Sequence, residues 1–165
     1  CTVTVKQPVT KLTLNKTSLT LMRNKPFALT AAAAPSNANN KAVTWKSSNT
    51  KAATVDSKGN IKAVAKGTAT ITATAKDGSG VKAVCKVTVT QPVTKITLNK
   101  TSLTLNRGKT FTLKATAGPA SANNKAVKWT TSNKAVATVT SKGVVKAVKK
   151  GTATITATAK DGSGK

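Results

Sequence analysis

One block of fourteen residues occurs twice in this chain without any change, as Gly67–Gly80 and as Gly151–Gly164. From Thr68 to Ala75 the threonines alternate with Ala and Ile, which is the period of a β-strand with one apolar face. Thr and Ile are β-branched and favour the pleated backbone of a strand. The pair Asp77-Gly78 that follows is typical of a tight hairpin turn. The block therefore predicts a strand and a turn that are used in two equivalent places.

The repetition extends over the whole chain. Trp45 corresponds to Trp129 and Cys1 to Cys85, and both pairs are 84 positions apart (129 − 45 and 85 − 1). Solenoid repeats are about 20–50 residues long, so a period of this length indicates a domain. Two units of roughly 80 residues are small, but they fall within the size range of domains that fold independently.

Short alternating runs separated by turn residues follow one another along each unit, and no helical period is present. This pattern predicts an all-β chain made of two tandem immunoglobulin-like β-sandwiches joined end to end. We expect residues 1–6 to be the closing strand of a preceding repeat or a donor strand, and residues 7–90 to be domain 1. Residues 91–165 would be domain 2, which lacks a last strand of its own. The joint at Gln91-Pro92 is short and predicts restricted flexing.

The composition argues against catalysis. The chain has 28 Lys and Arg against 3 acidic residues, no His, and a formal net charge of +25. General acid–base chemistry requires His, or a carboxylate or Lys with a shifted pKa, and the three aspartates are far apart in the sequence. Metal sites of the zinc or calcium type need clusters of Cys, His or carboxylates. We therefore expect no enzyme activity, no cofactor and no metal.

The charge admits two interpretations. The first is a solvated lysine surface that resists aggregation, and the second is a diffuse contact for anionic glycans, cell-wall polymers or extracellular DNA. Specific nucleic-acid binding is not expected, because stacking aromatics and helical recognition elements are missing, and no run of about 20 apolar residues predicts a membrane span. The candidate polyanion contacts are Lys62, Lys66, Lys82, Lys86, Lys146, Lys149 and Lys150.

Two motifs resemble those of the group 2 bacterial immunoglobulin-like domains found in surface adhesins of the invasin and intimin type. They are the run Trp129–Asn133, which recurs in the first copy with two substitutions, and the run Gly151–Ile155, which recurs there unchanged. The first copy departs at Asn24, where the second has Gly108, and at Ala52, where the second has Val136. The resemblance implies a structural or adhesive role on the bacterial surface or in the extracellular space, and it implies no common catalytic residue.

Each tryptophan lies in the middle of an alternating run, which favours core packing over a sugar-stacking platform. Cys85 shares a face with Val87 and Val89, which predicts a buried thiol, and a disulfide between the two cysteines is not expected because they are one domain apart. The predicted structural core residues are Trp45, Trp129, Phe27, Phe111, Ile71 and Ile155.

The two ends of the chain have complementary patterns. Cys1, Val3 and Val5 alternate as the closing strand Cys85–Val89 does, while the sequence after Lys165 would have to supply that strand for domain 2. One interpretation is a segment cut from a longer array of repeats. The other is that Cys1, Val3 and Val5 form a donor strand that completes domain 2 of an identical neighbour, so that subunits join head to tail in a filament. The expected partners are accordingly neighbouring repeats or identical subunits.

Overall fold

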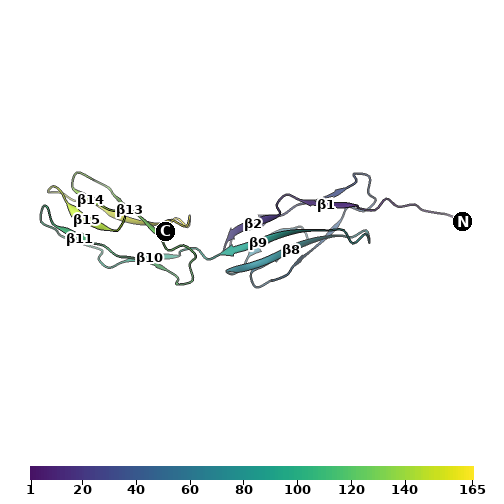
Figure 1. Cartoon of the computed structure of the whole chain (residues 1–165), viewed down its shortest axis with the longest axis horizontal. Coiled ribbons are helices and arrows are strands. Elements are labelled where there is room, and N and C mark those ends of the chain that lie inside the picture. The colour runs from purple at the N-terminus through teal and green to yellow at the C-terminus, as the bar shows by residue number, and fades with distance from the viewer. The chain divides into compact units, whose positions relative to one another are not determined.

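The computed structural model describes residues 1–165 and contains sixteen strands and no helix (Figure 1). The strands divide between two compact units, Cys1–Gln91 and Pro92–Lys165, which we call domain 1 and domain 2. This confirms the predicted all-β class. Since the chain has no helix at all, it has none that is long and apolar enough to cross a membrane.

Domain 1 consists of nine strands in three sheets. One sheet has the order β2-β9-β8-β5, a second has the order β3-β7-β6, and β1 pairs with β4. All pairs are antiparallel except β2 with β9. The strands are β1 (Lys11–Leu14), β2 (Ser18–Met22), β3 (Pro26–Ala28), β4 (Ala31–Ala34), β5 (Val43–Ser47), β6 (Ala53–Val55), β7 (Asn60–Ala63), β8 (Gly67–Ala75) and β9 (Lys82–Thr90).

Domain 2 has seven strands, and all of its pairs are antiparallel. The pair β10–β12 matches β1–β4, the sheet β11-β15-β14 matches β3-β7-β6, and the pair β13–β16 matches β5–β8. The strands are β10 (Lys95–Leu98), β11 (Thr110–Thr112), β12 (Ala115–Gly118), β13 (Val127–Thr131), β14 (Ala137–Val139), β15 (Val144–Ala147) and β16 (Ile155–Ala159). No strand of domain 2 corresponds to β2 or β9.

The alternation of apolar residues seen in the sequence builds the core of domain 1. Ile71 on β8 and Cys85 on β9 are opposite each other in register, and both are fully buried. They belong to a large cluster that also contains Leu21, Leu29 and Ile61, and Trp45 and Phe27 pack against its side. A smaller cluster lies around Val9, Leu12 and Ala75.

Two local features of domain 1 depend on a single residue each. Strand β1 begins at Lys11, and ahead of it the Val9 N–H is bound by the carboxylate of Asp77. The replacement of glycine by Asn24 is tolerated because Asn adopts the left-handed region readily: Asn24 has φ +67° and Gly108 has φ +82°.

Candidate functional site: an unfilled strand position in the second domain

Strand β9 is an interior strand of domain 1. It runs parallel to β2 on one side and antiparallel to β8 on the other (Figure 1), with Leu19 opposite Val87 and Ile71 opposite Cys85. Its inward side chains Cys85, Val87 and Val89 are at most 1 % exposed. The strand therefore connects its two neighbours and fills the centre of the main core.

The corresponding position in domain 2 is unfilled in this chain. Residues Gly67–Thr70 of β8 form their ladder with β9, and the identical residues Gly151–Thr154 form no strand, so β16 begins only at Ile155. Ser102–Asn106 differs from β2 only at its last residue and also forms no strand. We call the backbone of Ser102–Asn106 and Gly151–Ile155, the two segments that would flank a ninth strand, the empty strand position.

Apolar side chains beside the empty strand position are also less buried than their counterparts in domain 1. Leu21 and Ile71 are buried in domain 1, whereas their counterparts Leu105 and Ile155 are only partly buried, and Leu103 is 37 % exposed. Domain 2 has the counterpart of the smaller cluster, around Val93 and Ala159, and no counterpart of the large one. The empty strand position therefore leaves apolar side chains unpaired together with backbone hydrogen-bonding groups.

Two hydrogen bonds at the end of β9 in domain 1 have no counterpart in domain 2. The Arg23 N–H donates to the carbonyl of Thr90 at 2.8 Å, and the Arg23 guanidinium donates to Oε1 of Gln91 at 3.4 Å. Gln91 is the one buried polar residue of the chain. Arg107 corresponds to Arg23 and makes neither bond, because no strand and no glutamine lie beside it in this chain.

The segment Cys1–Gln7 matches Cys85–Gln91 at five of its seven positions but pairs with no strand. Cys1 is exposed, as are Val3 (79 %) and Val5 (87 %), although these three residues match the buried Cys85, Val87 and Val89. The segment is held to the rest of domain 1 at Gln7, whose backbone N–H donates to Oδ1 of Asn39 and whose carbonyl accepts from the Asn39 N–H at 3.0 Å. Residues 1–7 form no strand in this chain.

The sequence profile of the bacterial Ig-like domain (group 2) family matches residues 8–87 and again residues 92–165. The chain belongs to this family. Both copies are therefore Ig-like domains, and the empty strand position is a feature of the second one. The family assignment agrees with the resemblance carried by the Trp129–Asn133 and Gly151–Ile155 runs.

The chain has relatives among longer proteins. An uncharacterized protein of Clostridium acetobutylicum is 44% identical over 153 residues, which cover 93% of this chain and 16% of that protein. An Ig-like virion protein of Serratia phage KSP90 is 33% identical over 160 residues, covering 94% of this chain and 62% of the relative. The chain thus corresponds to part of each relative, and the Ig-like family together with the virion relative supports a structural or adhesive module.

Among solved structures, the C-terminal 282-residue fragment of intimin, in complex with the intimin-binding domain of its translocated receptor, has a TM-score of 0.51 to this chain. The match covers 94% of this chain and 61% of the fragment at 18% identity. At this identity the likeness concerns the fold, which is that of tandem Ig-like domains.

Within the two Ig-like domains, the predicted core residues lie at different depths. Ile71 is fully buried, and Trp45 and Phe27 pack partly buried against the large cluster of domain 1. Their counterparts Ile155, Trp129 and Phe111 are all partly buried. Each tryptophan ring covers a glycine, Gly59 in domain 1 and Gly143 in domain 2, at a distance where a Cβ would be within about 3 Å of the ring.

In both Ig-like domains the first segment is bound by an aspartate at the equivalent position. The Val9 N–H donates to Oδ2 of Asp77, and the Val93 N–H donates to Oδ2 of Asp161. Hydrogen bonds from the Ser79 hydroxyl and then from the Val9 N–H lower the pKa of Asp77. Burial raises the pKa of Asp161, but hydrogen bonds from Ser163 and Val93 outweigh this effect and lower the pKa overall.

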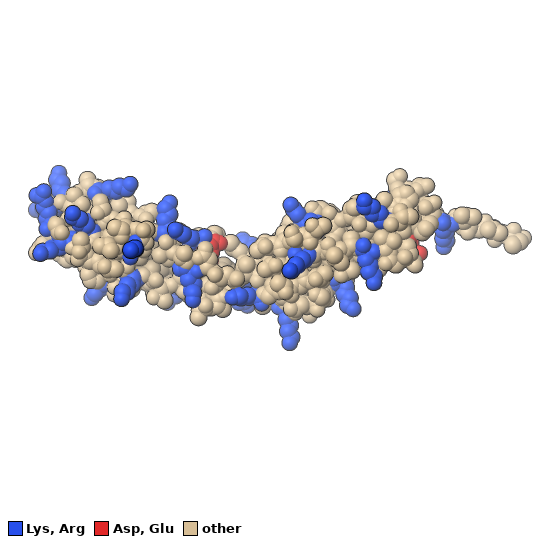
Figure 2. All heavy atoms as spheres, viewed as in Figure 1, with Lys and Arg blue, Asp and Glu red and all other residues tan.

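The candidate polyanion contacts are exposed but dispersed. Lys62 lies on β7, Lys82 and Lys86 lie on β9, and Lys146 lies on β15. Lys66, Lys149 and Lys150 lie in the turns that precede the repeated block. On the face shown in Figure 2, Lys and Arg side chains are spread over both Ig-like domains and do not gather in one patch.

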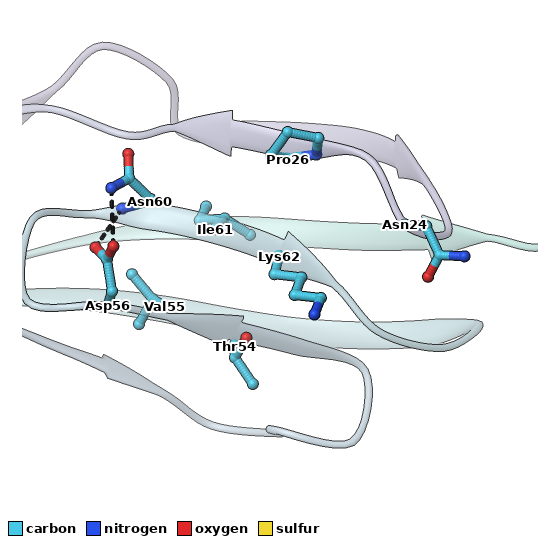
Figure 3. A pocket seen from close by; sticks show the side chains of 8 residues that line it. All are labelled: Asn24, Pro26, Thr54, Val55, Asp56, Asn60, Ile61 and Lys62. Atoms are coloured by element: carbon cyan, nitrogen blue, oxygen red, sulfur yellow. Dashed lines mark hydrogen bonds between the residues drawn. The ribbon is translucent and has the colours of Figure 1, made fainter.

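An open hollow on domain 1 is lined by residues of β3, β6 and β7 and the turns beside them (Figure 3). Its single carboxylate, Asp56, accepts hydrogen bonds from the Lys58 N–H and from the N–H and side chain of Asn60, at 2.8–2.9 Å. Hydrogen bonds from Asn60 lower the pKa of Asp56. Asp56 thus orders its own turn, and no group of three His, Cys, Asp or Glu residues capable of holding a metal occurs in the chain.

Sequence reasoning identified the donor-like alternation of Cys1–Val5 but missed Arg107, Gln7 and the segment Ser102–Asn106. The 84-residue offset contained the signal for all three, because it aligns them with Arg23, Gln91 and β2. Their role becomes visible only when β9 is seen to lie between two other strands.

Proposed function

We propose that this chain is a structural or adhesive module of an extracellular or surface assembly, whose second Ig-like domain is completed by a strand from a neighbouring unit. Units joined in this way would form a stiff rod or a head-to-tail filament. The observation that carries the proposal is the contrast between two copies of one repeat, one of which contains an interior β9 while the other has an empty strand position.

The physical driving force resides in the side chains and backbone that β9 buries in domain 1. Three side chains of the β9 type would each contribute about 1.5–3 kcal/mol on full burial, before the cost of ordering the strand. Added main-chain hydrogen bonds would supply affinity, and the alternating side chains would supply specificity, as in other cases of strand addition. Because the added strand would be interior, it would contact sheet backbone on both sides.

The extracellular placement is supported by the virion relative and by the family. The chemistry of the chain supports a mechanical role, since its three carboxylates are all engaged in ordering turns or first segments. We propose no catalytic activity for the module.

A peptide with the sequence of Lys82–Gln91 tests the proposal. Added in excess to the 165-residue chain, it should bind domain 2 and raise the temperature at which that domain unfolds, with little effect on domain 1. The matched control is the same peptide carrying Val87→Asp and Val89→Asp, which should have no effect. Failure of the first peptide to bind at millimolar concentration would contradict the proposal.

A second candidate function is adhesion to polyanions through the lysines, favoured by 28 basic residues against 3 acidic ones. With only two arginines and a dispersed distribution, such binding would be diffuse and would weaken steeply with salt. Binding of an acidic polysaccharide should therefore be lost between about 50 and 200 mM salt. Selective binding that persists at the higher salt concentration would instead indicate a dedicated glycan site.

A further inference from the structure

We propose that the outer face of the sheet β2-β9-β8-β5 in domain 1 binds an extended acidic polysaccharide, which lies along β8 between Lys46 on one side and Lys82 and Lys86 on the other. This inference rests on the second candidate function, adhesion to polyanions, and gives it a place and a ligand class. It does not depend on how domain 2 is completed.

The alternation along each strand decides which side chains of this sheet face solvent. Strand β8 turns Ile71 and Ala73 into the core, so the threonines that alternate with them face outward. The same period places one lysine of β5 and three residues of β9 on the outer face, and all four are exposed. We use the name threonine–lysine face for seven residues: Thr70, Thr72 and Thr74 of β8, Lys46 of β5, and Lys82, Val84 and Lys86 of β9.

The strand register determines how the three lysines are arranged. Thr72 is opposite Lys46 on β5 and opposite Val84 on β9. Lys82 and Lys86 lie two residues to either side of Val84 on β9. With strands about 4.8 Å apart and a rise of about 3.3 Å per residue, the Cα atoms of the three lysines form a triangle with sides of about 12–13 Å. Thr72 lies inside this triangle.

Strand β8 contributes short hydroxyl side chains to the middle of the face. Thr70, Thr72 and Thr74 are half-buried, and their hydroxyls have no hydrogen-bond partner within the chain. A hydroxyl can both donate and accept, so each of them can bind a sugar hydroxyl in either sense. Strand β8 therefore supplies a row of free hydroxyls, with positive charge on the strand at either side.

The threonine–lysine face carries no carboxylate. Asp56 lies in the turn between β6 and β7 and binds Asn60, and Asp77 follows β8 and is bound by the Val9 N–H and by Ser79. The third aspartate belongs to domain 2. An anionic chain along β8 would therefore approach three lysines without competing with an internal carboxylate on this face.

The threonine–lysine face also lacks aromatic side chains and arginine. Single-stranded nucleic acids bind through aromatic stacking, and protein interfaces depend on Trp, Tyr and Arg. Trp45 packs against the core on the inner side of β5. Val84 is the one apolar side chain of the face, and at 53 % exposure it is available to the C–H groups of a sugar ring. This combination favours an acidic polysaccharide over a nucleic acid or an acidic protein.

The first test measures binding of the 165-residue chain to polygalacturonate and to polyphosphate by titration calorimetry over a series of salt concentrations. The combined variant Lys46→Gln, Lys82→Gln and Lys86→Gln should bind both polyanions at least about tenfold more weakly, and the slope of log affinity against log salt should fall by about two to three. The matched control is Lys11→Gln, Lys58→Gln and Lys62→Gln, which removes three exposed lysines from β1, the β6–β7 turn and β7. The control should stay within about twofold of the unmodified chain.

A second test separates a polysaccharide site from a site for any polyanion. Thr72→Val removes the central hydroxyl and keeps the shape of the side chain. It should weaken polygalacturonate binding by about three- to tenfold through a lost hydrogen bond and leave polyphosphate binding unchanged. Unchanged polygalacturonate binding by this variant, or tighter binding of single-stranded DNA than of polygalacturonate by the unmodified chain, would overturn the assignment to an acidic polysaccharide.

The outcomes also separate this inference from the functions proposed above. If the two triple variants weaken binding equally, the attraction is diffuse, so the threonine–lysine face is wrong and the second candidate function stands. If the chain binds neither polyanion even at low salt, both are wrong. Completion of domain 2 by an added strand is tested independently by the β9 peptide.

Discussion

Domain 1 and domain 2 differ in structure where their sequences are the same. Their strands β8 and β16 lie in sequence blocks that are identical over fourteen residues, yet β8 has nine residues and β16 has five. The segment matching β2 loses its strand as well. The comparison teaches that these residues form strands only when an interior neighbour supplies the other half of the ladder.

The loss of strands in domain 2 is confined to the sheet that corresponds to β2-β9-β8-β5 of domain 1. Phe27 pairs with Ile61 in domain 1, and Phe111 pairs with Val145 in the equivalent register of domain 2. The sheets β3-β7-β6 and β11-β15-β14 therefore form whether or not a strand of the β9 type is present. Domain 2 retains one complete sheet and the smaller core cluster, and its weak region is the empty strand position.

The largest effect is expected from filling the position within the chain. Extension beyond Lys165 by a copy of Lys82–Thr90 should stabilise domain 2 by several kcal/mol, because three apolar side chains become buried at about 1.5–3 kcal/mol each. Urea unfolding followed by NMR would report each domain separately. The same extension with aspartates in place of both valines is the control, and equal stabilisation by the two extensions would contradict the account.

The next largest effect is expected from a matched pair of isoleucines. Ile71→Ala should destabilise domain 1 by about 2–5 kcal/mol, because the side chain is fully buried against β9. Ile155→Ala should cost domain 2 on the order of 1 kcal/mol, since Ile155 is only partly buried. Denaturant unfolding of each variant measures both values, and equal costs would show that Ile155 is packed as tightly as Ile71.

Replacement by alanine should have the same effect at Gly59 and at Gly143, because both glycines lie outside the sheet that loses strands in domain 2. A Cβ at Gly59 would be 2.2 Å from the Leu29 carbonyl oxygen, and one at Gly143 would be 2.4 Å from that of Leu113. Alanine at either site should cost on the order of 1–3 kcal/mol in its own domain. Gly78→Ala is the control, with the same φ of +87° as Gly59 and no atom within 4 Å, and it should cost less. A much smaller cost at Gly143 than at Gly59 would extend the difference between the domains to this region.

The smallest expected effect is a loss of folding stability at acidic pH. The pKa of Asp77 and that of Asp161 are lower in the folded chain than the usual value, so their contribution to stability is fully present above the unfolded pKa and is lost as the pH falls through the folded pKa. Both domains should therefore lose stability below about pH 4. Asp77→Asn should flatten this dependence in domain 1 alone, as measured by thermal unfolding between pH 2 and 7, and an unchanged pH profile would exclude the Val9 contact as its cause.

Much of this architecture could be predicted from the sequence, because strand alternation and the 84-residue offset are local signals. Ile71 and Cys85 were placed on inward faces correctly by period alone. The weaker burial of Ile155 could not be predicted, since its sequence surroundings are identical to those of Ile71 over the whole block. The difference arises from β9, whose residue Cys85 lies opposite Ile71 in domain 1 and whose counterpart is missing from this chain in domain 2.

The central claim is that domain 2 has an empty strand position which an added strand fills. The most direct measurement is amide hydrogen exchange by NMR at Gly67–Ile71 and Gly151–Ile155, two segments whose identical sequences make their protection factors directly comparable. In dilute monomer we predict slow exchange in the first segment and fast exchange in the second, with the second becoming slow when the β9 peptide is added. Equal protection in the dilute monomer, or no change on adding the peptide, would contradict the claim.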